Sequence, residues 1–441
     1  MNNDAWAALR EGYTDPVRDV LWGHIYLTPA MAALIHSFPF TRLSRIFQLG
    51  PAYGVYPGAT HTRASHSIGV YHLARRLLLN LAERGADSWF SAEGVRSFLC
   101  AGLLHDLGHF PYTHSLKELP LIPHEALTAD LIRAEPVRSL VGATGADPDM
   151  TAAIVDTREG EGAASRGGEL HFYRKLLSGV LDPDKLDYLN RDARYCGVPY
   201  GAQDVDYIYS RLYPHLERGI DIESRGIPSV EAILFSKYLM YRTVYWHRSV
   251  RSPTAMIKTA VLAGLRDGVF SEEALYNLDD QGLFGLLAED IHPRFSLARQ
   301  VRDGRFYAAV AEFPFAEFPF AEFPFIEGEH GGLTDITARF RYEEALAEKL
   351  SRLSGGTGRR RIYPGELIID IPEPVSFETG LYVRDEARYF TESTGVFSVD
   401  VVEGFIKSLR TIRIFVDPVH ENRLHLSEPA DILRSRKNRL C

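Results

Sequence analysis

The chain has 441 residues, more than one hydrophobic core usually organises, so we expect two domains or one domain with large additions. Its content of 45% hydrophobic and 24% charged residues is typical of a globular protein. A formal net charge of -9 argues against duplex nucleic acid as the main partner, because neutralising phosphates requires a basic surface.

No apolar run approaches the ~18 residues of a membrane span, and the first residues lack the basic and apolar regions of a signal peptide. The three cysteines, Cys100, Cys196 and Cys441, have neither metal-site nor disulfide spacing. We therefore expect a cytoplasmic protein without a membrane partner.

Two helix starts are predicted before residue 70. Thr28-Pro29 combines a capping residue with proline at the first helical position. A longer amphipathic helix is predicted from about Arg63 to before Gly85. His66 shares the apolar face of that helix, so we expect it to point inward. Taken alone, His66 suits a hydrogen-bonded core histidine, and Arg63 suits a solvated residue at a helix start.

Residues 91–114 contain an apolar helix that runs into an adjacent imidazole and carboxylate. Ser91 is a suitable N-cap, and apolar residues at helical spacing lead to His105-Asp106. Burying these two side chains costs several kcal/mol unless they have a partner. A divalent cation is the simplest partner. The alternative is that His105 caps the helix and Asp106 forms a buried salt bridge, and a dipeptide alone does not decide between the two.

Residues 141–168 are rich in small and polar residues and are predicted to be an irregular excursion. Another helix is predicted from Asp182, with Asp182 at the N-cap and proline next. Its residues Asp184, Tyr188 and Asp192 are four apart and therefore share one face. A solvated charged face is the competing interpretation.

Helical patterns recur over residues 230–265, where Tyr245 taken alone favours core packing. The pentapeptide AEFPF then occurs three times over residues 311–325, and its regular prolines exclude a helix. We expect an extended insertion there; an exposed phenylalanine contact surface is the alternative. The runs at 366–371 and 411–416 resemble strands. The predicted fold is mainly α, with domain 1–290, a linker or insert over 291–335, and a smaller α/β region over 336–441.

Imidazoles and carboxylates from three separate elements suit a divalent metal site. The four candidate ligands are His66, His105, Asp106 and Asp184. Mn, Fe, Zn or Mg would all fit this set. Further imidazoles and cations in the same segments suit a phosphate ester, whose oxygens gain charge during hydrolysis. They are His109, His114, His124, Arg63 and Lys185.

The order H…HD…D resembles the HD-domain metal-dependent phosphohydrolases. Longer strings resemble one branch of them, the deoxynucleoside triphosphate triphosphohydrolases. The matching strings are QLG at 48–50, PGATHTRASHSIGV at 57–70, HDLGH at 105–109, DPDKLDY at 182–188 and GVPYG at 197–201. The resemblance covers about residues 15–265 well, and 360–420 more loosely. It implies a helical HD-domain fold.

Carried over by position, the resemblance implies a role for each matching residue. The metal ligands would be the four named above. Arg63, Lys185 and Tyr188 would contact the triphosphate. Gln48 and Asp192 would recognise the sugar 3'-hydroxyl, with Leu49 and Tyr245 packing on the nucleoside. His109, His114 and His124 would be the catalytic imidazoles, with the last two as proton donors or phosphate ligands.

Two positions depart from the family pattern. The family has an acid three residues after the histidine that matches His114, where this chain has Lys117 followed by Glu118. A phosphate-binding arginine of the family is Lys237 here, which keeps the charge but loses the bidentate fork.

The resemblance implies hydrolysis of deoxynucleoside triphosphates to a deoxynucleoside and inorganic tripolyphosphate. Two alternatives stay open. One is another HD nucleotide phosphohydrolase, such as a nucleotidase, a phosphodiesterase or a guanosine-tetraphosphate hydrolase. The other is a non-catalytic nucleotide-binding regulator. The resemblance also implies a homo-oligomer, dimer or tetramer, and nucleotide activators.

Overall fold

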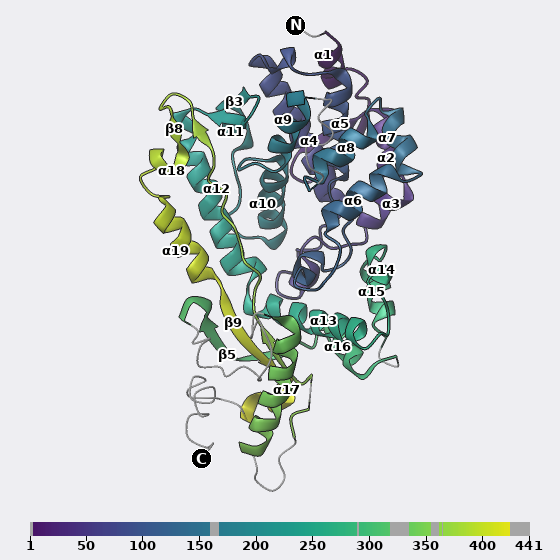
Figure 1. Cartoon of the computed structure of the whole chain (residues 1–441), viewed down its shortest axis with the longest axis vertical. Coiled ribbons are helices and arrows are strands. Elements are labelled where there is room, and N and C mark those ends of the chain that lie inside the picture. Colours follow the sequence, from purple (N-terminus) through teal and green to yellow (C-terminus); the bar gives the residue numbers. More distant parts are fainter. Residues whose placement is uncertain are drawn as a thin grey trace.

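The computed structural model describes residues 3–158, 167–288, 291–317, 335–353, 361–363 and 365–423. Most of these residues are helical, which confirms the predicted fold class (Figure 1). No helix among the described residues is both long and apolar enough to cross a membrane.

Three helices organise the N-terminal half: α4 (Arg63–Glu83), α5 (Ala92–Leu104) and α10 (Pro183–Cys196). The predicted caps are confirmed, because Ser91 Oγ accepts a hydrogen bond from Gly94 N at 2.8 Å and Asp182 Oδ1 accepts one from Lys185 N at 2.7 Å. Helices α4 and α5 pack through fully buried apolar side chains of one core, and α10 contacts α4.

Smaller helices surround this group. They are α1 (Asn3–Arg10), α2 (Pro29–Ile35), α3 (Phe38–Leu43), α6 (His124–Arg133), α7 (Val137–Ala143), α8 (Pro148–Val155), α9 (Gly167–Leu177) and α11 (Val205–Ser210). The predicted irregular excursion over residues 141–168 is wrong for its described part. Asp147 caps α8, and the apolar side chains of α8 are buried against α5 and α6.

The helical pattern over residues 230–265 is divided between α12 (Ile227–Met240) and α13 (Arg248–Arg266). One π turn, Tyr241–Tyr245, separates them. Helices α14 (Glu273–Tyr276), α15 (Asp280–Leu286) and α16 (Ser296–Arg302) follow, and α16 packs on α13.

The strands form three small sheets. Strands β1 (Asp15–Asp19) and β2 (Gly23–Leu27) form an antiparallel hairpin. A four-stranded sheet has the order β3 (Leu212–His215), β4 (Gly219–Ile222), β7 (Tyr382–Val383), β8 (Arg388–Tyr389). A three-stranded antiparallel sheet has the order β5 (Ala308–Pro314), β9 (Thr411–Val416), β6 (Leu367–Asp370). Helix α17 (Ile336–Leu353) packs on β6, and α18 (Phe390–Ser393) and α19 (Val399–Leu409) lie between β8 and β9 in the chain.

The segment 291–335, predicted as a linker or insert, contains regular structure in its described part. Helix α16 and strand β5 both lie inside it, and the first AEFPF copy forms most of β5, whose backbone pairs with β9. Phe313 packs against the sheet and is not an exposed contact residue. The third copy lies outside the described residues. The C-terminal chain also returns to the N-terminal half, because β7 pairs in parallel with β4.

Candidate metal and phosphate site

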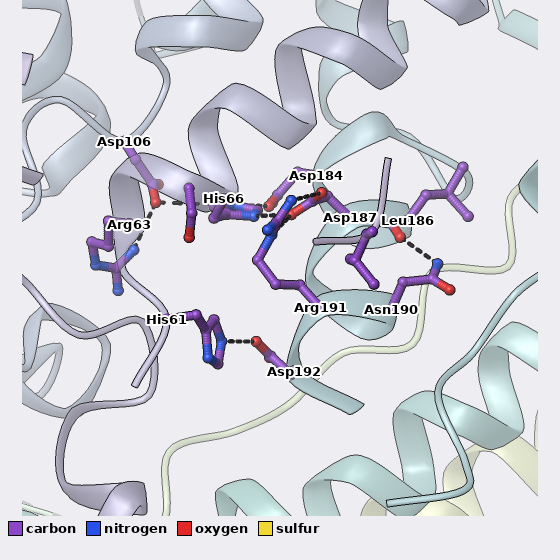
Figure 2. Close-up of polar contacts among 12 residues, drawn as sticks. His61, Arg63, His66, Asp106, Asp184, Leu186, Asp187, Asn190, Arg191 and Asp192 are labelled. Atoms are coloured by element: carbon purple, nitrogen blue, oxygen red, sulfur yellow. Dashed lines mark hydrogen bonds and ion pairs between the residues drawn. The ribbon is translucent and has the colours of Figure 1, made fainter. Parts of the chain in front are cut away.

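The four predicted metal ligands come together from α4, the end of α5 and the start of α10. Figure 2 shows three of them, His66, Asp106 and Asp184. His66 Nε2 lies 3.0 Å from Asp184 Oδ1 and 4.0 Å from Asp106 Oδ2. His105 Nε2 lies 3.3 Å from Asp106 Oδ1 and 3.8 Å from Asp184 Oδ1. The donor atoms of His66, His105 and Asp184 all lie within 4.8 Å of one another.

Two of these distances, 3.0 and 3.3 Å, fit the spacing of neighbouring donors on a first-row divalent cation, and the other two, 3.8 and 4.0 Å, are wider. Donor–metal bonds of about 2.0–2.2 Å place neighbouring donors roughly 3.0–3.5 Å apart. His105 Nε2 is buried without a hydrogen-bond partner, while its Nδ1 lies 3.0 Å from the carbonyl oxygen of Gly102. The ring therefore presents a free nitrogen to the two carboxylates, as a metal ligand would.

His66 is held from behind by a fully buried carboxylate. Asp187 Oδ2 lies 2.8 Å from His66 Nδ1, which leaves Nε2 toward the donor cluster. Arg191 donates two hydrogen bonds, of 2.8 and 2.9 Å, to the carboxylate of Asp187, and Trp22 Nε1 donates a third to it at 2.6 Å. A carboxylate behind a ligating imidazole fixes its orientation and raises its basicity.

The electrostatics of His66 suit cation binding. Burial opposes its charged form, but the hydrogen bonds to Asp184 and Asp187 outweigh burial and raise the pKa of His66 to about 10. The pKa of Asp187 is lowered although it is buried, because Arg191 and His66 both stabilise its charge. A cation bound at His66 Nε2 would replace that proton.

The loop that follows Asp106 is pinned by a buried arginine from α3. Arg42 donates to the carbonyl oxygens of Leu107 and His109 at 2.6 Å each, and to that of Leu278 at 2.9 Å. Asp106 itself accepts a hydrogen bond from Arg63 Nη1 at 2.8 Å. Both ends of the loop are therefore fixed by guanidinium groups.

The three predicted catalytic imidazoles lie together beside Asp106. The ring centroid of His109 lies 3.8 Å from that of His124 and 4.8 Å from that of His114. Burial and the nearby Arg63 hold the pKa of His109 well below its ordinary value, and burial lowers the pKa of His124 to about 4. Donor atoms of Asp106, His109 and His124 form a second group with metal-ligand spacing. His114, in the turn 113–116, is exposed.

At the position where the family has an acid, this chain has Lys117, and the next residue, Glu118, makes contacts away from the imidazoles. Glu118 does not face His124; it pairs with Lys258 Nζ at 2.7 Å and with Arg339 at 3.2 Å. His124 Nδ1 instead lies 3.2 Å from Glu125 Oε2. The chain after His114 is thereby tied to α13 and α17.

Of the residues predicted to recognise the sugar, Asp192 lies about two helical turns further along α10 than Asp184. Asp192 is buried and held by His61 Nε2 at 2.7 Å and by the hydroxyl of Tyr245 at 2.6 Å. Gln48 N donates to the carbonyl oxygen of His61 at 3.0 Å, and Gln48 Oε1 is buried without a hydrogen-bond partner. Leu49 is half-buried and packs on two core clusters.

The predicted phosphate contacts are already paired with carboxylates. Lys185 Nζ lies 2.6 Å from Asp182 Oδ2, and Lys237 Nζ lies 3.4 Å from Glu378 Oε2. Arg63 is paired with Asp106. Tyr188 follows Lys185 by three residues on α10, and burial raises its pKa well above the ordinary value. The buried salt bridge that the sequence offered as the alternative for Asp106 is present, with Arg63 as its partner, and His105 is the C-cap of α5. The pairing of the two lysines with Asp182 and Glu378 was not predicted.

Two family patterns match the chain. The HD domain matches residues 63–171, and the HD associated region matches residues 211–392. The chain is an HD-domain protein. The HD match includes three of the four candidate ligands, and the associated region includes Lys237, Tyr245 and Glu378.

The relatives of this HD protein include uncharacterised and characterised proteins. An uncharacterised protein of Bacillus subtilis is 35% identical over 51% of this chain and 49% of its own length. A deoxynucleoside triphosphate triphosphohydrolase of Bos taurus is 42% identical over 56% of this chain and 47% of its own. The HD protein thus spans about half the length of the curated relatives it matches.

A crystal structure of a hypothetical protein from Aquifex aeolicus has the same fold. It superposes with a TM-score of 0.67 and 23% identity, over 93% of this chain and 98% of that one. The likeness extends beyond the HD domain to the C-terminal strands.

Four side chains around the HD site received no role from sequence: Asp187, Arg42, His61 and Glu378. The pair Asp187–Arg191 has helical i,i+4 spacing, which predicts only a local ion pair. Arg42 donates hydrogen bonds to carbonyl oxygens of distant segments, and His61 contacts the side chain of Asp192, 131 residues away. Glu378 lies in a segment without a motif. His61 and Asp187 lie within the matching strings at 57–70 and 182–188, which gave them no role, whereas Arg42 and Glu378 lie outside every matching string.

Proposed function

We propose that the protein hydrolyses deoxynucleoside triphosphates to a deoxynucleoside and inorganic tripolyphosphate, using a divalent cation. One observation carries the proposal: α10 presents a candidate metal ligand, Asp184, and a candidate sugar-recognition residue, Asp192, two helical turns apart. A single rigid element would thus align the α-phosphate with the metal and the sugar with Asp192.

The cation would act as a Lewis acid and would lower the pKa of a bound water toward neutrality. His66, His105, Asp106 and Asp184 would hold it. The protein's own groups would do the rest of the work. Arg63, fixed by Asp106, would stabilise charge on the α-phosphate oxygens. Desolvation and the nearby Arg63 and Lys117 hold the pKa of His114 well below its ordinary value, so it would donate a proton to the leaving 5'-oxygen only once bound phosphates offset those two cations.

Asp192 and Tyr245 would orient the sugar. Because His61 binds one carboxylate oxygen of Asp192 and Tyr245 binds the other, the carboxylate is held in one orientation, in which it would accept a hydrogen bond from a 3'-hydroxyl. The unpaired Gln48 Oε1 offers a second acceptor for a hydroxyl. Deoxynucleotides are thus the proposed partners.

A second candidate is another HD phosphohydrolase acting on a nucleotide with fewer phosphates. The pairing of Lys185 with Asp182, and of Lys237 with Glu378, favours it, because paired cations attract a triphosphate less. A non-catalytic nucleotide-binding regulator is a weaker candidate, since it would not need four converging ligands.

The test is a panel of the four deoxynucleoside triphosphates and GTP, each with Mn²⁺ or Mg²⁺, read by product chromatography. We expect tripolyphosphate and a deoxynucleoside, and loss of both products in His105→Ala. The exposed His36→Ala is the matched control and should retain activity. Orthophosphate or pyrophosphate as the sole product would support the second candidate and contradict the first.

The proposed assembly is a cytoplasmic homo-oligomer, and nucleotide activators are part of the proposal. Light scattering of the purified chain with and without deoxynucleoside triphosphates tests both. A monomer under every condition would contradict the oligomer.

A further inference from the structure

Two lysines beside the candidate metal site share one carboxylate from the C-terminal part of the chain. Glu378 Oε2 lies 3.4 Å from Lys237 Nζ and 3.7 Å from Lys185 Nζ. Both lysine side chains are largely buried, 8% and 15% exposed, whereas Glu378 is 40% exposed. With Asp182 as the other partner of Lys185, two cations face two anions, and the group has no net charge.

Glu378 reaches the lysines from an extended segment between β6 and β7, which runs along α12 (Figure 1). Val375 and Phe377 are buried in the core on one side of this segment. Ser376 and Glu378 alternate with them, as successive side chains of an extended chain do. Ser376 Oγ donates to Glu378 Oε1 at 3.0 Å, and Lys237 Nζ donates to the Ser376 carbonyl oxygen at 2.8 Å.

The two carboxylates differ in how firmly they are held. Asp182 binds Lys185 at 2.6 Å, is 2% exposed and also caps α10, so a ligand cannot replace it without damage to the helix start. The contacts of Glu378 to the ammonium groups are longer than the roughly 2.7–2.9 Å of strong charge-assisted bonds. Its exposure to water lets it turn away at little cost.

We propose that Glu378 is a specificity-determining residue: it competes with the outer phosphates of a nucleotide for Lys185 and Lys237, and so sets the preference between nucleotides with three phosphates and those with one. This inference rests on the proposed function and deepens it. A phosphate held at the metal and Arg63 does not need these lysines. Phosphates beyond the first do, and they bind only when Glu378 has moved.

The physical consequence is a reduced apparent affinity for polyphosphates. A ligand that must displace an internal competitor binds with a reduced apparent affinity. This apparent affinity equals the intrinsic affinity multiplied by the fraction of time that the subsite is free. Removing the charge of Glu378 should therefore tighten binding of inorganic tripolyphosphate by about 3- to 20-fold, the size expected for two partly exposed ion pairs. Binding of orthophosphate should change less than twofold.

The test measures binding of inorganic tripolyphosphate and orthophosphate to the metal-loaded full chain by calorimetry, with excess Mg²⁺ and constant ionic strength. Glu378→Gln is compared with Glu386→Gln, which removes a carboxylate of the same C-terminal part that pairs with Arg388. We expect tighter tripolyphosphate binding only in Glu378→Gln. Lys237→Gln combined with Glu378→Gln should abolish most of the gain, because the lysine that benefits is then absent.

Unchanged or weaker tripolyphosphate binding by Glu378→Gln would overturn the inference, as would an equal gain for orthophosphate. The outcome is independent of turnover. If no deoxynucleotide is hydrolysed but Glu378→Gln still binds tripolyphosphate more tightly, the proposed function fails and the competitor role stands. If hydrolysis occurs and the two proteins bind alike, only the competitor role fails.

Discussion

Asp187 Oδ2 lies 2.8 Å from His66 Nδ1 and is buried completely, so His66 can turn only Nε2 toward Asp184 and Asp106. This contact connects the candidate metal site to an ion-pair network, because Arg191 binds both Asp187 and, at 2.9 Å, Asp19. The orientation of one metal ligand therefore depends on residues that do not touch the metal.

Replacing Asp187 with Asn should weaken metal binding by about 10- to 100-fold, because the imidazole loses its carboxylate partner. Metal content after dialysis against a chelator, measured by atomic emission, checks this. The control is Asp19→Asn, which also removes a carboxylate from Arg191 but does not touch His66. Equal metal loss in both variants would attribute the effect to Arg191 and contradict the orienting role of Asp187.

Gly69 on α4 is required by the same network. A Cβ at this position would overlap Asp187 Oδ1 and Arg191 Nη2. Gly69→Ala should therefore destabilise the fold by about 1–3 kcal/mol and reduce metal retention. Gly404→Ala in α19, where a Cβ meets nothing within 4 Å, should be neutral or stabilise by up to about 1 kcal/mol. Urea unfolding distinguishes the two, and similar values for both would refute the packing argument.

Arg42 should stabilise the HD loop through backbone acceptors. Arg42→Met leaves three carbonyl oxygens without their donor, and we expect a loss of about 2–4 kcal/mol in the free energy of unfolding. Arg45→Met, which removes an exposed pair with Asp279, should cost less than about 1 kcal/mol. A small effect at Arg42 would show that the loop does not depend on this guanidinium.

Glu343 in α17 gives a pH dependence. Burial raises its pKa to about 8, against 4.5 for an ordinary glutamate, although Ile369 N donates to it. Between these two values the folded state binds a proton that the unfolded state does not. The contribution of Glu343 to stability is therefore present below pH 4.5 and falls as pH rises toward 8, by up to about 1.4 kcal/mol per pH unit.

Glu343→Gln should remove this part of the dependence. Urea unfolding of the wild-type protein and of Glu343→Gln at pH 5.5 and at pH 8 measures it. The free energy of unfolding of the variant, relative to that of the wild type, should be higher at pH 8 than at pH 5.5. A constant difference across that range would mean that Glu343 is ionised throughout.

The sequence predicts much of the core of the fold, because the caps at Ser91 and Asp182 and the apolar spacing of α4 are local signals. It also predicts which four residues can converge on a cation, through the motif order. It does not predict β5, because a proline-rich repeat gives no sign that its backbone pairs with β9, about a hundred residues further along the chain.

The site residues that the sequence did not predict were missed for one physical reason. Arg42 binds carbonyl oxygens of distant segments, and Glu378 reaches Lys185 across about two hundred residues of chain. Such pairs depend on tertiary packing and leave no periodic pattern. The two lysines were thus predicted without Glu378, the carboxylate that they share.

The most direct test of the account follows deoxynucleotide hydrolysis during metal titration of the chelator-stripped protein. We predict no tripolyphosphate before metal is added, recovery of hydrolysis as a divalent cation is returned, and no recovery in Asp184→Ala at any metal concentration. Hydrolysis by the stripped wild-type protein, or full recovery in Asp184→Ala, would contradict a catalytic cation held by His66, His105, Asp106 and Asp184.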